Sequence, residues 1–152
     1  MSTPVSFLTD EMREQAIGTE SKPVTILVEK GAIVNFAQAI GDANPIYNDE
    51  IVARKSQSGT LIVPPTFLRS IRAVQPEIPF EMPFERLLDA GSDWDYFEPV
   101  RVGDQITAVG RIIDISERSG RIGLMIFINT LITYSNQFNE VAANQTNTLI
   151  RY

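Results

Sequence analysis

Long runs of β-branched and aromatic residues dominate the second half of the chain. This pattern limits the possible folds more than any other feature of the sequence. Turn residues, chiefly Gly, Pro and Asn, separate the runs. The expected strands are residues 87–90, 92–98, 105–116, 123–135 and 141–151. Three of them exceed ten residues, and at about 3.3 Å per residue each of these three would be well over about 30 Å long. Consecutive strands of this length predict one curved antiparallel sheet.

The first half of the chain predicts helices. Ile33, Phe36, Ala37 and Ile40 are spaced as i, i+3, i+4 and i+7, which indicates a one-faced helix over residues 30–40 that stops at Gly41. Helices followed by consecutive strands predict an α+β fold, with the sheet wrapped around a buried helix. The other expected elements are a helix at 8–17, a strand at 23–28, a turn at 50–53 capped by Asp49, and a buried second helix after Pro65 with the apolar stripe Phe67, Leu68, Ile71 and Val74.

Residues 75–84 contain three prolines and therefore predict an irregular loop. The loop also carries Phe80, Met82 and Phe84. These side chains either line an apolar pocket or simply pack the loop onto the rest of the protein, and the sequence leaves both interpretations open.

Composition excludes several classes of function. With 152 residues, we expect a single domain over residues 1–152. The net charge of −6 argues against a nucleic-acid partner. Cysteine and histidine are both absent, so we expect no disulfide, no metal site, no cofactor and no Ser-His triad. No apolar run approaches the roughly 20 residues of a membrane span, and the start of the chain does not resemble a secretion signal; we expect a cytoplasmic protein.

The chemistry is expected in the segment 40–69, which reads IGDANPIYNDEIVARKSQSGTLIVPPTFLR. Residues 41–49, GDANPIYND, resemble the motif G-D-x-N-P-(I/L)-H-x-D of the MaoC-like, R-specific enoyl-CoA hydratase and dehydratase family. Every fixed position of the motif matches except the histidine, which is Tyr47.

Further segments, including residues 64–67 (PPTF) and 94–99 (WDYFEP), extend the resemblance over nearly the whole chain. Together they are most similar to the FAS1-like, amino-terminal type of MaoC dehydratase unit. The resemblance implies the hot-dog fold, in which a curved antiparallel sheet wraps a central helix.

The resemblance implies that Asp42 and the motif histidine position and activate water, while a backbone N–H holds the thioester carbonyl. Asp42 is present, although a carboxylate there also suits a turn that ends a helix. Tyrosine has an ordinary pKa of about 10 and is a poor base at neutral pH, so Tyr47 is interpreted as an orienting or packing residue rather than a catalytic one. Pro65 replaces a glycine whose N–H serves the carbonyl, which leaves the amide of Thr66 as the donor.

The remaining candidates concern substrate binding. Asn44 is expected to fix the loop through its side-chain amide. Arginine pairs with phosphate, so arginines near the motif are candidates for coenzyme A phosphates, although for each of them taken singly a solvated surface charge is the favoured interpretation. The candidate substrate-binding residues are Asn44, Thr66, Phe67, Phe80, Met82 and Phe84, of which the last four are expected to line an acyl channel.

Three hypotheses follow, all with an acyl-CoA or acyl-carrier thioester as the small-molecule partner. In the first, the chain is a non-catalytic subunit of a heteromeric enoyl-CoA hydratase or 3-hydroxyacyl-thioester dehydratase, bound to a catalytic MaoC-like subunit. In the second, it is a self-sufficient homodimeric hydratase that uses Asp42 and Tyr47. In the third, it is an acyl-CoA binding module without turnover.

Overall fold

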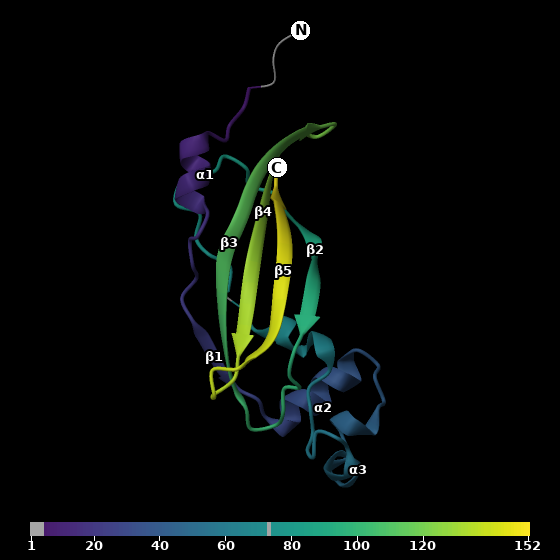
Figure 1. Ribbon diagram of the computed structural model, residues 1–152. Helices are drawn as coiled ribbons and strands as arrows, with labels where there is room; N and C mark the ends of the chain where they lie inside the picture. The colour runs from purple at the N-terminus through teal and green to yellow at the C-terminus, as the bar shows by residue number, and fades with distance from the viewer. Residues whose placement is uncertain (1–4, 73) are drawn as a thin grey trace.

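One five-stranded antiparallel sheet, in the order β1-β3-β4-β5-β2, forms the body of the protein (Figure 1). The structure is a computed structural model and describes residues 5–72 and 74–152. No helix within these residues is long and apolar enough to cross a membrane. The elements in chain order are α1 (Asp10–Ala16), β1 (Val24–Leu27), α2 (Lys30–Ala39), the 3-10 helix η1 (Pro45–Tyr47), α3 (Glu50–Lys55), the 3-10 helix η2 (Pro65–Ser70), β2 (Leu87–Tyr96), β3 (Gln105–Gly120), β4 (Gly123–Ser135) and β5 (Val141–Arg151).

The strands follow the sequence pattern closely. The expected bounds of β4 and β5 are confirmed. β3 is longer than expected because its pairing with β4 continues to Gly120 opposite Gly123, which moves the turn to residues 121–122. The two runs expected at 87–90 and 92–98 form the single strand β2. A β-bulge between Asp89 and Ser92 accommodates Gly91, whose φ of 110° favours glycine.

The helices of the first half begin and end close to their predicted positions. The Thr9 side chain caps α1 by accepting a hydrogen bond from the Met12 amide at 3.1 Å. Asp49 caps α3 in the same way, as expected. In α2, Ile33 and Ala37 are buried in the core, but Ile40 is 49% exposed because the helix ends at Ala39.

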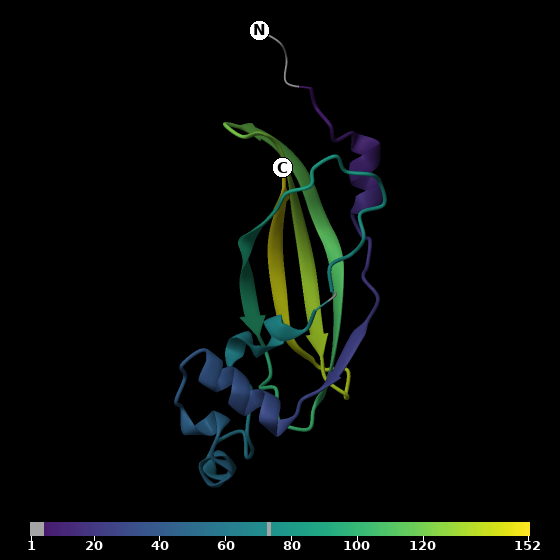
Figure 2. The same cartoon turned by 180° about the vertical axis from the view of Figure 1, so that it is seen from behind.

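The expected long helix after Pro65 is wrong in its length. Only the 3-10 helix η2 forms, and the chain becomes extended at Ile71 (φ −73°, ψ 116°). From there the chain crosses the inner face of the sheet to β3, runs beside α1 and returns to β2 (Figure 2). Ile71 and Val74 are buried as the apolar stripe predicted, but an extended segment buries them. The helical segments α2, α3 and η2 instead gather at one end of the sheet (Figure 1).

The inner face of the sheet carries two apolar clusters, one toward each end. The cluster at the helical end contains Ile132 and Tyr134 of β4 together with Ile33, Ala37, Tyr47, Phe67 and Leu68. The cluster at the other end contains Ile126 and Ile128 of β4 together with Leu8, Ala16 and the loop residues Phe80, Met82 and Phe84. The loop residues therefore pack residues 75–84 against α1 and the sheet.

A single carboxylate on β3 anchors residues 6–8, which precede α1. Glu117 accepts hydrogen bonds from the amides of Phe7 at 2.7 Å and Leu8 at 2.8 Å, and from the Ser6 hydroxyl at 2.7 Å. Burial by itself would raise the pKa of Glu117, but these hydrogen bonds and the nearby charge of Arg13 together lower it. A pKa lowered in the folded state stabilises the protein above the unfolded value and loses that effect as the pH falls.

We therefore expect the Glu117→Gln variant to be less stable than the wild type by about 1–2 kcal/mol at neutral pH. The difference should shrink as the pH falls below 4.5, the ordinary value for a glutamate, and vanish once Glu117 is protonated in both states. Chemical denaturation of both proteins between neutral pH and about pH 3 measures it. A difference that does not change with pH would show that the carboxylate charge does not contribute to the anchor.

Candidate functional site

The motif loop is held by two successive side-chain turns. Gly41 ends α2 with a φ of 71°. The Asp42 carboxylate accepts a hydrogen bond from the backbone N–H of Asn44 at 3.0 Å. The side-chain oxygen of Asn44 in turn accepts one from the backbone N–H of Ile46 at 3.1 Å. These bonds fix the approach to η1, which begins at Pro45. Both side chains thus have a structural task, and that task sets the position of Tyr47.

Tyr47 ends η1 and is buried, with 8% of its surface exposed. Burial raises the pKa of its phenol, and the negative charge of Asp42 raises it further. At neutral pH the phenol is therefore protonated, so it can donate a hydrogen bond but cannot remove a proton from water.

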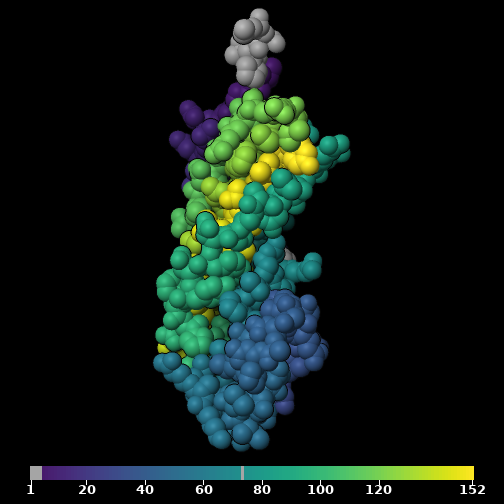
Figure 3. Space-filling view, turned by 90° about the vertical axis from the view of Figure 1, so that its right-hand side faces the viewer, coloured from purple at the N-terminus to yellow at the C-terminus, as the bar shows by residue number. Residues whose placement is uncertain are grey.

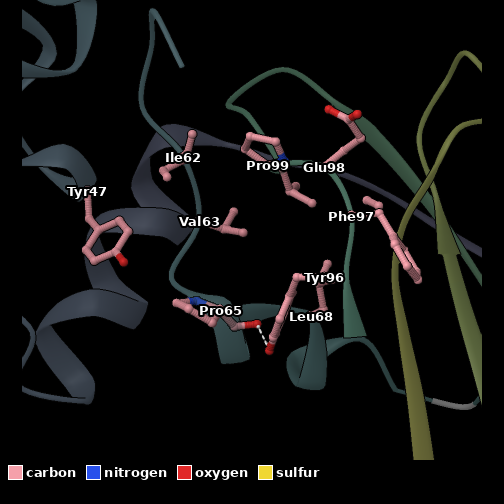
Figure 4. A pocket seen from close by; sticks show the side chains of 11 residues that line it. Tyr47, Ile62, Val63, Pro65, Leu68, Tyr96, Phe97, Glu98 and Pro99 are labelled. Carbon is pink, nitrogen blue, oxygen red and sulfur yellow. Dashed lines mark hydrogen bonds between the residues drawn. The ribbon is translucent and has the colours of Figure 1, made fainter. Parts of the chain in front are cut away.

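Tyr47 lies at one wall of a pocket of about 330 Å³ (Figure 4). On the opposite wall are Tyr96, at the end of β2, and Phe97, which follows it. Asp42 is not among the lining residues. The pocket is lined by Tyr47, Ile62, Val63, Pro65, Leu68, Tyr96, Phe97, Glu98, Pro99, Val100 and Ala142. A mostly apolar pocket with a few polar groups is the usual form of a small-molecule site.

The Tyr96 hydroxyl donates a hydrogen bond to the Pro65 carbonyl at 2.8 Å (Figure 4). This bond ties the end of β2 to the first residue of η2 and fixes the peptide between Pro65 and Thr66. Thr66 itself is exposed. In the described part of the chain, no hydrogen bond is found for the Thr66 amide.

The structure does not bring the four expected acyl-channel residues together. Phe67 is buried and packs edge-on against Phe36, with ring centroids 5.6 Å apart. Phe80 and Phe84 pack around Phe7. Phe80 and Met82 also border a separate pocket that contains Arg151. Phe67 belongs to one apolar cluster, and Phe80, Met82 and Phe84 pack against the other.

The most prominent site residues that sequence reasoning missed form an aromatic stack on the sheet. Trp94 stacks on Tyr96 at 5.7 Å between ring centroids, and on Tyr134 at 5.6 Å. Residues 94 and 96 alternate within an expected strand, which places both side chains on one face of the sheet. Tyr134 comes from another strand, so the sequence carries no signal for its place in the stack.

The sequence comparisons identify the family. The family model described as "FAS1-like, dehydratase domain region" matches residues 15–145. A UPF0336 protein of Streptomyces coelicolor is 33% identical over 114 residues, which cover 70% of this chain and 76% of the relative. The chain therefore belongs to the FAS1-like branch of the hot-dog dehydratases, and the resemblance seen in the motif is confirmed.

A further relative and two solved structures extend the comparison. A probable enoyl-CoA hydratase alpha subunit of Thermomonospora curvata is 28% identical over 138 residues, which are 79% of this chain but only 43% of the relative. The MaoC-like dehydratase of Rhodospirillum rubrum superposes with a TM-score of 0.74 at 23% identity, covering 96% of this chain and 97% of that one. One chain of the ChsH1-ChsH2 complex of Mycobacterium tuberculosis superposes with a TM-score of 0.73 at 19% identity, covering 93% of this chain and 87% of that one. These structures confirm the hot-dog fold.

Proposed function

We propose that this chain is a non-catalytic, acyl-thioester-binding subunit of a heteromeric enoyl-CoA hydratase or 3-hydroxyacyl-thioester dehydratase. The observation that carries the proposal is Tyr47. It takes the place of the motif histidine, and its environment raises its pKa further away from that of a base. Loss of a general base lowers a reaction rate by about 10²- to 10⁴-fold, so the catalytic base is supplied by a second subunit.

The part of the site that would bind the thioester carbonyl supports the same proposal. Pro65 has no N–H to donate to a thioester carbonyl, and its own carbonyl already accepts the hydrogen bond of Tyr96. The amide of Thr66 is the remaining donor at the start of η2. The general base and one backbone donor to the thioester carbonyl are therefore missing, while the apolar pocket beside them is retained.

The β2 edge is the surface proposed for the partner. β2 is ten residues long, and among the described residues it pairs only with β5, so its other side carries backbone groups without a strand partner there. Leu87, Leu88, Tyr96 and Phe97 on or beside this strand are about half exposed. Figure 3 looks at this side of the molecule and shows β2, in teal and green, at the surface. The ChsH1-ChsH2 structure, named as a complex, and the relative named as an alpha subunit support a second subunit.

The test is turnover of enoyl-CoA by three samples: this chain, a MaoC-like partner from the same genome with an intact G-D-x-N-P-x-H motif, and the two co-expressed. We expect a complex of both chains by mass, with turnover that survives Tyr47→Phe and Asp42→Asn in this chain. Replacing the histidine of the partner's motif should abolish turnover. The proposal fails if the purified chain alone turns over substrate and Asp42→Asn removes that activity.

The failure just described would favour the homodimeric hydratase, for which the retained Asp42 beside Tyr47 is the supporting observation. A third result, acyl-CoA binding without turnover in any combination, would favour the binding module. The same three samples thus separate all three hypotheses.

A further inference from the structure

Between its two apolar clusters, the inner face of the sheet carries a band of buried polar side chains. Thr130 of β4 and Asn147 of β5 lie opposite each other in the sheet, and Gln145 is one inward-facing position along β5. Thr130 is 0% exposed, and Gln145 and Asn147 are 1% exposed. Ile128 and Ile132 flank Thr130 along β4. In the middle of a hydrophobic sheet face, three such side chains need a physical reason.

Hydrogen bonds hold two members of the band, Gln145 and Asn147, whereas the Thr130 hydroxyl has no partner among the described residues. The Tyr134 hydroxyl donates to the Gln145 side-chain oxygen at 2.7 Å, and the Gln145 amide donates to the Ser92 hydroxyl at 2.8 Å. The side-chain amide of Asn147 donates a hydrogen bond to the Asp89 carboxylate at 3.1 Å. The side-chain oxygen of Asn147 accepts one from the side-chain amide of Gln75 at 3.0 Å. Buried polar groups must be paired in this way to avoid a large cost, yet a paired group contributes little more than apolar packing would. Stability alone does not favour a polar band here.

Gln145 of the band lines a cavity of about 300 Å³ whose lining is partly apolar and partly polar. The apolar lining residues are Ile71, Val74, Leu87, Ile132 and Leu149, and the polar ones are Arg69, Arg72, Gln75, Asp89, Tyr134 and Gln145. Arg69 and Asp89 pair at 2.9 Å, which balances their charges. The Tyr134 oxygen can still accept a hydrogen bond, and Gln75 and Arg69 retain further N–H groups. Arg72 adds a positive charge that no described carboxylate pairs with, so the polar lining residues offer several hydrogen-bond donors to an oxygen.

The cavity lies near the pocket beside Tyr47, although the two share no lining residue. The aromatic stack starts at Tyr96, which lines that pocket, passes through Trp94 and ends at Tyr134, which lines the cavity. On the other side, η2 runs along both spaces, with Leu68 at the pocket and Arg69 at the cavity. A ligand that is held at the pocket and extends past it along η2 would reach Gln145 and Tyr134.

We propose that this cavity receives the distal part of the acyl group and selects one that carries a hydroxyl or keto oxygen over a plain alkyl chain. The inference rests on the proposed acyl-thioester binding and names the class of acyl group. Tyr134 and Gln145 are the specificity-determining residues, and Gln75 and Arg69 supply donors. A site built to hydrogen-bond an oxygen disfavours a ligand without one, because its own polar groups then lose their partner.

The experiment compares two acyl-CoA esters of about ten carbons, alike except for one hydroxyl or keto oxygen, and moves that oxygen along the distal half of the chain. Affinities for the assembled complex are measured by calorimetry. One added hydrogen bond corresponds to about a tenfold difference, so at the best position the oxygenated ester should bind about tenfold more tightly. Tyr134→Phe and Gln145→Met should each bring the two affinities to within about threefold.

The outer face of the sheet offers a matched control. Thr146 lies on β5 next to Gln145 and faces the other side of the sheet, so Thr146→Val should leave the tenfold preference unchanged. Thermal unfolding verifies that each variant is folded, and the ratio of two affinities does not change if a variant only loses stability. Equal binding of both esters by the wild type, or a preference that survives Tyr134→Phe and Gln145→Met, would overturn the inference and leave the proposed function intact. Binding of neither ester would refute the proposed acyl binding itself, and the inference with it.

Discussion

Replacing Tyr47 by histidine is expected to raise enoyl-CoA hydration at this site by at least about 100-fold, since a general base contributes about 10²- to 10⁴-fold. The measurement uses the co-expressed complex with the motif histidine of the partner already replaced, so that only this chain can supply a base. The side chain at position 47 is presented by η1 at the wall of the pocket, and the smaller imidazole fits within the space of the phenol. A histidine with an ordinary pKa of about 6.5 is largely unprotonated at neutral pH.

Two variants serve as controls for this experiment. Tyr47→Phe removes the hydroxyl without adding a base, so turnover should stay at the background. Asp42→Asn added to Tyr47→His should remove the gain, because the resemblance assigns the pair a joint role. If Tyr47→His binds acyl-CoA normally but shows no gain, the missing base is not the only loss, and Pro65 becomes the next position to restore, as Pro65→Gly.

Gly110→Ala is expected to lower the free energy of unfolding by about 3 kcal/mol or more, at the upper end of overpacked sites. An added Cβ would lie 1.8 Å from the Val74 carbonyl oxygen, 3.0 Å from its carbon and 3.3 Å from Pro76 Cδ. Backbone atoms cannot rotate away as a side chain would. The crossing segment must therefore lift off the sheet, and both apolar clusters lose packing.

Gly31 provides the matched control. It lies in α2, and a Cβ there would meet nothing within 4 Å, so Gly31→Ala should stabilise the protein by up to about 1 kcal/mol. Thermal and chemical unfolding of the two variants measure both effects in one series. If Gly110→Ala were as stable as the wild type, the close approach of Val74 to β3 would not hold in solution.

Much of the fold was readable because its signals are local. The runs of β-branched and aromatic residues between turn residues defined β4 and β5 to the residue, and the capping of α3 by Asp49 followed from a side chain next to the helix. The helix after Pro65 was mispredicted because Phe67, Leu68, Ile71 and Val74 have helical spacing. Burial of all four is real, but the attraction of the sheet face for Ile71 and Val74 outweighed the local preference for a helix.

The sequence by itself determined the family and the departure that matters most, a tyrosine in the place of the motif histidine in a chain without any histidine. Only the tertiary structure decided what surrounds that tyrosine. The stack of Trp94 on Tyr134, the polar band through Gln145 and the contact of Gly110 with Val74 join residues that are far apart in the chain. Strand order and the path of the crossing segment create these contacts, whereas periodicity and composition reveal only which face of its own element a residue occupies.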